Sequence, residues 1–311
     1  MKKEKSMGLA HLQKRKGVKL FLLVLPGLIY VFVFCYLPLW GWILAFLDYK
    51  PGRIIRDCEF VGLHNFTVMF GNAFLRKNIF QSLKNTLGIH FLSYLWMPIN
   101  MFFAVFLSEL RNKKFQKVVQ TVSTLPHFIS WVIIYALVNN LFSSSGIVNV
   151  LLQDWGIIDK PLNILTTDKH VWITQVILQG WKNTGWSAIV YFSAIAGIDQ
   201  ELYEAAMVDG AGRMKRIWYI TLPHLMPTFF VLFIMSIGNL LSTGVDQYYI
   251  FSNAMNQKYI EVFDLYVYNL GIGNGNISYG VAIGIMKSGI ALMLFSMANY
   301  LSKKIRGSGI A

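Results

Sequence analysis

Long apolar stretches alternate with short polar ones along most of the chain. A helix needs about 20 apolar residues to cross the hydrocarbon core of a bilayer, at about 1.5 Å of rise per residue. Six stretches reach that length, so the pattern predicts an all-α polytopic membrane protein with six transmembrane helices. The stretches are residues 20–47, 85–108, roughly 121–142, 171–197, roughly 223–245 and 279–301.

The first stretch could be either a membrane span or the core of a cleaved leader. Residues 20–47 carry no charge, are too long for a signal-peptide core, and are followed by no small-residue cleavage site. We therefore expect them to remain as the first transmembrane helix. The predicted divisions are a basic tail (1–19), this helix (20–47), an external loop (48–84), a core of five transmembrane helices (85–301) that contains loop 199–223, and a second basic tail (302–311).

Basic residues are distributed unevenly between the two sides of the predicted membrane. The chain has 28 Lys and Arg against 15 Asp and Glu, a formal net charge of +13. Most of the basic residues fall in the two tails and in the loops after the second and fourth apolar stretches. Because cytoplasmic loops are enriched in Lys and Arg, both termini and loop 199–223 are predicted to be cytoplasmic. This topology accounts for the basic excess, and we expect no nucleic acid partner.

Composition and motifs argue against an enzyme. The chain is 55% hydrophobic and 14% charged, whereas soluble domains carry about 25% charged residues. Its two cysteines, Cys35 and Cys58, form no CxxC pair, and no HExxH, Cys/His cluster or Walker phosphate loop occurs. The histidines are scattered, so a membrane-embedded enzyme lacks a convergent catalytic set. We expect no catalytic residue, no metal site and no cofactor bound by this chain.

Loop 199–223 contains the signals of a short helix. Asp199 is a good N-cap for a helix from about Gln200 to Val208, and Gly210 suits the left-handed position that ends such a helix. A second short helix is expected over residues 213–219, stopping before Pro223. A docking knob for another protein and an amphipathic helix lying on lipid share these features, and the residues alone favour neither.

The same loop resembles a known motif. Glu204-Ala205-Ala206, Asp209-Gly210-Ala211, Ile220, Leu222-Pro223 and Pro227 are similar, at matching spacing, to the EAA motif of permease subunits in binding-protein-dependent ABC importers. In that family the loop is a coupling helix that inserts into a separate ATPase subunit. The resemblance implies an ATPase-coupling role for Glu204, Ala205, Ala206, Asp209, Gly210, Ala211, Ile220, Leu222 and Pro223.

Further segments resemble one carbohydrate branch of these permeases, which is similar to maltose permeases and imports complex oligosaccharides and polysaccharide fragments. They include "FVGLHNF", "GWKNTGWSAIVY" and "SIGNLLSTGVDQYYIFSNA". The resemblance implies the type I importer permease fold in the cytoplasmic (inner) membrane of a bacterium. The implied partners are membrane lipid, a second homologous permease, two ATPase subunits that hold ATP and Mg, an external solute-binding protein and an oligosaccharide substrate.

Two other transport functions are alternatives. One is a permease of the same importer class for a different small solute. The other is an ion-coupled secondary carrier, which would need an internal carboxylate or a midplane site built from repeats. No Asp or Glu lies in the middle of a predicted span, and no clear internal repeat is present. The secondary carrier is therefore disfavoured.

Polar residues in or next to the spans are candidates for the substrate pathway. Lys182 and Lys287 lie within apolar stretches, where an ammonium must face protein, water or a pore. Each could meet sugar hydroxyls, or could instead satisfy helix-end carbonyls or a carboxylate. The polar residues near the fifth span could hold sugar or make helix–helix contacts. The candidate pathway residues are Trp181, Lys182, Asn183, Asn239, Asp246, Gln247, Tyr248 and Lys287.

Overall fold

The computed structural model describes residues 2–306, with side chains from 17 to 300. Within that part of the chain the regular elements are all helical, apart from one isolated β-bridge between Leu47 and Phe60. The longest helices are α1 (Lys2–Val31), α3 (Ala73–Ser108), α7 (Val171–Ala196), α10 (Leu222–Gly238) and α14 (Ile277–Arg306).

Shorter helices connect the long ones. The α-helical connections are α2 (His64–Gly71), α4 (Lys113–Phe128), α5 (Trp131–Phe142), α6 (Ile147–Asp154), α8 (Gln200–Val208), α9 (Arg213–Arg216), α11 (Asp246–Phe251), α12 (Gln257–Ile260) and α13 (Phe263–Tyr268). The π and 3-10 segments are η1 (Phe32–Tyr36), η2 (Leu37–Phe46), η3 (Ile55–Asp57), η4 (Ile217–Thr221) and η5 (Asn269–Gly273).

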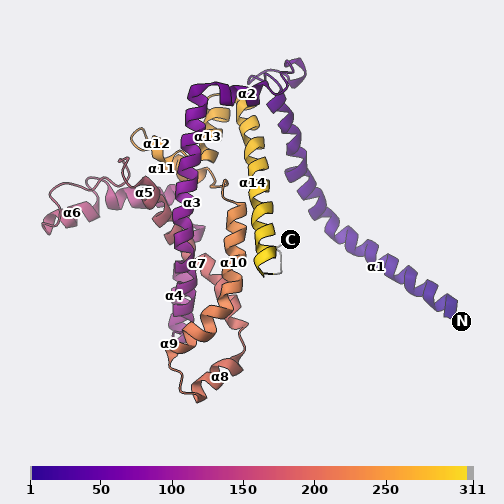
Figure 1. Ribbon diagram of the computed structural model, residues 1–311, viewed down its shortest axis with the longest axis vertical. Helices are drawn as coiled ribbons and strands as arrows, with labels where there is room; N and C mark the ends of the chain where they lie inside the picture. The colour runs from indigo at the N-terminus through magenta and orange to yellow at the C-terminus, as the bar shows by residue number, and fades with distance from the viewer. Residues whose placement is uncertain (1, 307–311) are drawn as a thin grey trace.

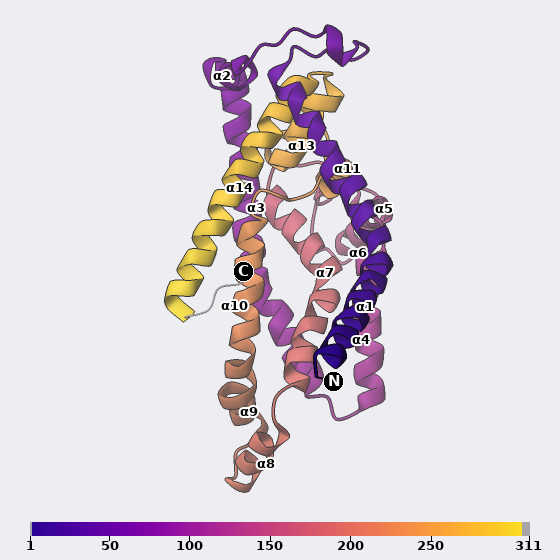
Figure 2. The same ribbon diagram turned by 90° about the vertical axis from the view of Figure 1, so that its right-hand side faces the viewer.

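Long helices form a bundle with different structures at its two ends. In Figures 1 and 2, α3, α10 and α14 run along the molecule and α7 crosses between them. Helices α8 and α9 lie at one end, and α2 lies at the other. Helix α1 leads away from the bundle, and α5 and α6 extend sideways from it in Figure 1. A buried cluster that includes Val105, Ala188 and Leu225 joins α3, α7 and α10.

Five helical segments among the described residues are long and apolar enough to cross a membrane. The fourth predicted span, residues 171–197, forms the single 26-residue helix α7 but is not one of the five. Gln175, Gln179 and Asn183 contribute to the lower hydropathy of this helix. The predicted count of six spans therefore stays a prediction. The five segments are Gly17–Phe46, Ala73–Ser108, Trp131–Asp154, Arg213–Gly238 and Ile277–Tyr300.

Two predicted spans differ from the observed helices at their ends. The second begins at Ala73 rather than at residue 85, because the Asn72 side chain caps it by accepting from the N–H groups of Phe74 and Leu75. The predicted external loop 48–84 thus includes α2 and the first turns of α3. The fifth span ends at Gly238 instead of reaching residue 245.

The third predicted span, roughly 121–142, is not one helix. Helix α4 ends at Phe128, and α5 begins at Trp131 after a break. Pro126 lies in the last turn of α4 and lacks the N–H that continues a helix, while Ser130 caps α5 through its hydroxyl. The chain changes direction at this break (Figure 1).

The second short helix of loop 199–223 does not stop before Pro223. Helix α9 passes through the π-turn η4 directly into α10. In η4 the Leu222 N–H donates to the carbonyl of Ile217, five residues earlier. A wider turn of this kind gives room for the ring of Pro223, which would otherwise clash with the carbonyl four residues before it. The expectation that this second helix ends before the fifth span was wrong.

Candidate functional site

Helix α8 and the turn after it form a compact knob, residues 199–211, at one end of the bundle (Figure 1). The Asp199 carboxylate accepts from the N–H of Glu201 at 3.0 Å. Gly210 adopts φ +74°, and the Ala211 N–H donates to the carbonyl of Ala206 at 2.8 Å. The predicted helix bounds and the left-handed glycine are both confirmed.

The residues predicted to couple to an ATPase fall into two groups. Glu204, Ala205 and Asp209 are exposed on the knob, and Ala206 and Ala211 are half-buried beside them. Ile220, Leu222 and Pro223 lie in the continuous helix that follows. Leu222 is buried in the cluster between α3, α7 and α10. The first group is available for contact with a partner, and the second joins the knob to the bundle.

Two side-chain contacts fix the knob and the start of α9 to the rest of the molecule. The Tyr203 hydroxyl of α8 lies 2.9 Å from the Thr221 hydroxyl in η4. The Arg213 guanidinium lies 3.0 Å from the Glu109 carboxylate at the end of α3, and it also donates to the Glu109 carbonyl at 2.7 Å. The knob is therefore joined to η4, which continues into α10, and the start of α9 is joined to the end of α3.

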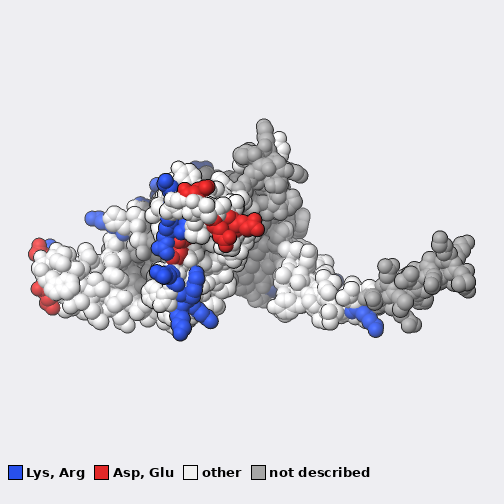
Figure 3. Space-filling view, turned by 90° about the horizontal axis from the view of Figure 1, so that it is seen from below, with Lys and Arg blue, Asp and Glu red and all other residues white. Residues whose placement is uncertain are grey.

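Charges are separated on this end of the molecule. Figure 3, seen from the side where α8 and α9 lie, shows acidic side chains gathered beside a band of basic ones. Helix α8 contributes Glu201 and Glu204, and α9 contributes Arg213, Lys215 and Arg216. Exposed apolar residues accompany the acids, since Val208 is 88% exposed. Such a mixed surface suits contact with another protein.

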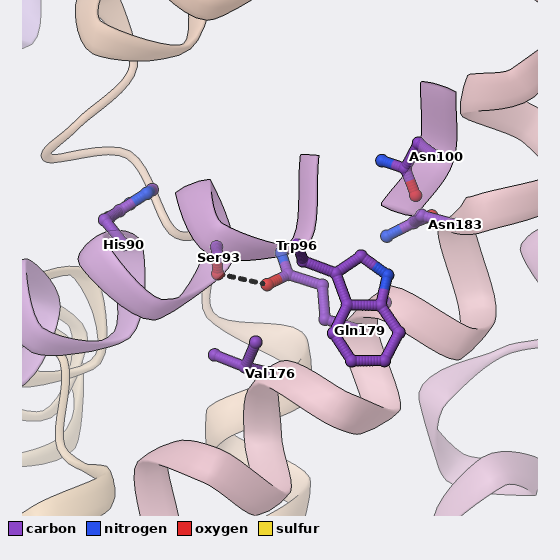
Figure 4. Close-up of a pocket in the computed structure, with 8 residues that line it drawn as sticks. His90, Ser93, Trp96, Asn100, Val176, Gln179 and Asn183 are labelled. Atoms are coloured by element: carbon purple, nitrogen blue, oxygen red, sulfur yellow. Dashed lines mark hydrogen bonds between the residues drawn. The ribbon is translucent and has the colours of Figure 1, made fainter. Parts of the chain in front are cut away.

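A polar cavity of about 150 Å³ lies between α3 and α7 (Figure 4). An adjoining cavity of about 420 Å³ extends to α10 and is lined there by Ser236 and Asn239. Among the described residues, His90 Nε2 is buried at these cavities and has no hydrogen-bond partner. The first cavity is lined by His90, Ser93, Trp96, Asn100, Val176, Gln179, Gly180 and Asn183.

Hydrogen bonds between the two helices hold several of these side chains in place. Trp96 Nε1 donates to the Thr184 hydroxyl at 3.0 Å, and that hydroxyl lies 3.0 Å from the Asn100 amide oxygen. Ser93 donates to Gln179 at 3.4 Å (Figure 4). Amides and a hydroxyl can donate to and accept from a polar solute, and the indole offers an apolar face. This combination suits a hydroxyl-rich molecule.

Lys182 is buried, with 8% of its surface exposed, and it points at the end of α4. Its ammonium donates to the carbonyls of Pro126 at 3.0 Å and His127 at 2.8 Å, and also to that of Ile129. It lies 5.4 Å from the centre of the Trp131 ring. The Pro126 carbonyl also accepts from the Ile129 N–H at 3.2 Å. Carbonyls at the end of a helix lack the usual helical partners, and the lysine binds this group of carbonyls from α7.

Lys287 of α14 forms an ion pair with Asp264 of α13. The other carboxylate oxygen of Asp264 accepts from the Gly244 N–H at 3.0 Å. The pair therefore joins α14 and α13 to the segment that follows α10. Of the two roles considered for Lys287, the structure shows the carboxylate contact.

The other predicted pathway residues occupy different surroundings. Asn183 and Asn239 line the cavities. Gln247 donates to the backbone and side-chain oxygens of Gln175, and Tyr248 is fully buried next to it. Burial, and then the charge of Asp264, raise the pKa of the Tyr248 phenol, so it remains a neutral hydroxyl. Trp181 and Asp246 are exposed away from both cavities.

Sequence reasoning missed the side of the cavity that α3 provides. His90, Ser93, Met97 and Asn100 recur at helical spacing within one apolar stretch and share one face of α3. A polar stripe of this kind in a membrane helix indicates a face turned to protein or to a cavity. That spacing was the signal that could have located these residues.

The chain is similar to known proteins. Residues 97–307 match the family described as "Binding-protein-dependent transport system inner membrane component". The polygalacturonan/rhamnogalacturonan transport system permease protein YteP of Bacillus subtilis is 40% identical over 296 residues, which cover 94% of this chain and 89% of that protein.

Two solved structures are also similar. One is a bacterial ABC transporter involved in the import of the acidic polysaccharide alginate, with a TM-score of 0.82 and 32% identity over 95% of this chain and 99% of that one. The other is the bacterial alginate ABC transporter in complex with an alginate pentasaccharide-bound periplasmic protein. It has a TM-score of 0.83 and 32% identity, over 95% of this chain and 98% of that one.

Proposed function

This chain belongs to the family of inner membrane components of binding-protein-dependent transport systems, and from that premise we propose that it is a permease subunit that carries oligosaccharides across the cytoplasmic membrane of a bacterium. The observation that carries the substrate assignment is the polar cavity between α3 and α7. Its amides, hydroxyl groups and indole match the hydroxyls and apolar ring faces of sugars. The names of the similar proteins, which refer to polygalacturonan and alginate, support the same substrate class.

Transport by this chain needs partners that supply energy and substrate. We place a second homologous permease beside it, two ATPase subunits with ATP and Mg against the knob of residues 199–211, and an external solute-binding protein on the opposite face. The resemblance of this loop to a coupling helix supports the ATPase contact. The complex of the alginate transporter with a periplasmic protein supports the third partner.

The contacts of the knob suggest how movement reaches the cavity. Tyr203 links α8 to η4, and η4 continues into α10. The far end of α10 contributes Ser236 and Asn239 to the larger cavity. When the ATPase subunits close and displace α8, the displacement passes along α10 to one wall of the cavity. In this proposal the closure turns the pore from inward-facing to outward-facing while the loaded binding protein is docked.

A reconstituted complex tests this proposal. The chain, its sister permease, the ATPase and the binding protein are placed in proteoliposomes, and ATP-dependent uptake is measured. The panel contains galacturonan oligosaccharides, alginate oligosaccharides, a neutral hexose oligosaccharide and a free amino acid. We expect uptake of at least one oligosaccharide and none of the amino acid. Uptake of the amino acid alone would favour a permease for a different small solute, and uptake driven by an ion gradient without ATP would favour a secondary carrier.

A further inference from the structure

His127, in the last turn of α4, contacts two residues of the cavity wall while lining neither cavity itself. Its Nδ1 lies 2.9 Å from the amide oxygen of Asn183. Its ring stacks on Trp186, with centroids 4.5 Å apart and an angle of 2° between the planes. Asn183 lines the smaller cavity and Trp186 lines the larger one. One side chain therefore supports both cavities from behind.

The backbone that carries His127 is held firmly against α7. Lys182 donates to the carbonyl of His127 and to the carbonyls of Pro126 and Ile129 on either side of it. Gly185 of α7 lies against the backbone of Ser123, so closely that an added Cβ would be 2.2 Å from the Ser123 carbonyl oxygen. The end of α4 thus has a defined position from which the imidazole reaches the cavity wall.

The hydrogen bond to Asn183 has a chemical direction. An amide oxygen only accepts, so the imidazole is the donor in this arrangement and carries its proton on Nδ1. The amide nitrogen of Asn183, with two N–H donors, then faces the cavity, as Figure 4 shows. The stacked imidazole also opposes rotation of the Trp186 indole, because rotation would lose the face-to-face contact.

We propose that His127 is a positioning residue for transport: it fixes the Asn183 amide and the Trp186 indole in the orientations in which they hold the solute. This inference rests on the proposed permease function. By this inference α4 affects solute binding although His127 lines neither cavity, because His127 orients two side chains of α7. Without the imidazole the cavity keeps its lining residues, but two of them lose their fixed orientation.

Two substitutions separate the two contacts of the imidazole. His127→Phe keeps a ring against Trp186 and removes the donor to Asn183. His127→Asn keeps a donor near the position of Nδ1 and removes the ring. Neither removes the backbone carbonyl that Lys182 binds. His64→Phe, at an exposed histidine of α2, is the matched control.

The measured quantity is the amount of solute imported per ATP hydrolysed, in the reconstituted complex with saturating loaded binding protein. One hydrogen bond corresponds to about a fivefold change in an equilibrium. We therefore expect His127→Phe to lower import per ATP about fivefold while the stimulated ATPase rate stays the same. His127→Asn should lower it as well, and His64→Phe should have no effect.

A double variant tests whether His127 acts through Asn183. Asn183→Ala alone should lower import per ATP, and adding His127→Phe should cause little further loss, because the two changes remove the same contact. Additive losses would overturn the proposal, as would import and ATPase falling in parallel, which indicates a purely structural role, or unchanged import in His127→Phe. If the wild-type complex imports no oligosaccharide of the panel, the proposed substrate class fails. The same variants are then compared with the solute that the complex does import.

Discussion

At the scale of single residues, the two ammonium groups within the bundle both have partners from the chain itself. Lys182 satisfies carbonyls that α4 leaves open, and Lys287 neutralises Asp264. Burying an ammonium is costly unless it is hydrogen-bonded or paired. Both lysines therefore contribute to the relative placement of helices.

Lys182→Met should destabilise the chain because the carbonyls of His127 and Ile129 lose this donor, while the Pro126 carbonyl keeps the Ile129 N–H. An unsatisfied buried polar group costs about 1–3 kcal/mol, so the thermal unfolding temperature of the purified complex and its yield should both fall. Lys182→Arg keeps the charge and serves as the comparison. A complex of normal stability that has lost transport would contradict this result and favour direct contact of Lys182 with the solute.

Lys287→Met alone should lower the stability of the chain more than Lys287→Met combined with Asp264→Leu. Removal of one partner from a buried ion pair leaves an unpaired charge and costs about 3–5 kcal/mol, and this pair is partly buried, so the loss should fall below that range. The double variant Lys287→Met with Asp264→Leu should recover part of that loss, although the Gly244 N–H loses its acceptor. Denaturation of the unchanged chain and of the two variants in the same detergent checks this order. A double variant less stable than Lys287→Met would contradict it.

At the scale of elements, local signals in the sequence were sufficient for α8. The capping residue Asp199 and the glycine at 210 lie next to the helix they limit, so its bounds could be predicted. The break between α4 and α5 has local signals in Pro126 and Ser130, but its carbonyls also accept from Lys182, more than 50 positions away in the sequence. No sequence pattern near the break indicates a partner that lies so far away along the chain. The continuation of α9 into α10 was missed for a different reason, because proline usually marks a helix end and the π-turn makes an exception possible.

The turn after α8 provides a test of the knob. Gly210 has φ +74°, and an added Cβ would meet nothing within 4 Å, so substitution is penalised by backbone strain and not by a clash. Gly210→Val should cost about 1–2 kcal/mol and distort the knob, whereas Gly210→Asn should be tolerated because Asn adopts left-handed conformations. The measurement is the amount of ATPase that co-purifies with the membrane-inserted complex. Equal ATPase content for both variants would contradict this prediction.

Charge on α8 gives a second test of the same surface. Glu204 is exposed on the knob, so Glu204→Lys should leave membrane insertion intact and weaken binding of the ATPase. Stimulated ATP hydrolysis should fall in consequence, because the knob transmits movement only when it is bound. Glu201→Lys, on the same helix, shows whether the effect depends on this position or on charge in general. Normal ATPase binding and turnover in Glu204→Lys would contradict the coupling role.

At the scale of the whole molecule, the orientation in the membrane remains a prediction from the distribution of Lys and Arg. A single cysteine at position 160, in the loop after α6, should react with an impermeant thiol reagent added outside intact cells. One at position 213, at the start of α9, should react only after the membrane is opened. Cys35 and Cys58 are replaced first. The reverse pattern would invert the topology and contradict an ATPase contact at the knob.

The first span, Gly17–Phe46, buries none of its most apolar window within the chain, and its Trp40 is 79% exposed. Composition alone predicted that such a surface must meet lipid or another subunit. The polar cavity could not be predicted in the same way. Its walls come from stretches about 80 residues apart, and only the packing of α3 on α7 brings them together.

The contact of the knob with η4, Tyr203 to Thr221, and the contact of α9 with the end of α3, Arg213 to Glu109, have a mechanical consequence. A rigid segment held by one contact can rotate about that contact without moving the helix that holds it. A rigid segment held by two contacts cannot rotate unless both of the helices that hold it move as well. A torque applied to this end of the molecule is therefore shared between α3 and α10, and both helices contribute residues to the larger cavity. A twist at one end of the bundle thus acts on two of the helices that line the cavity.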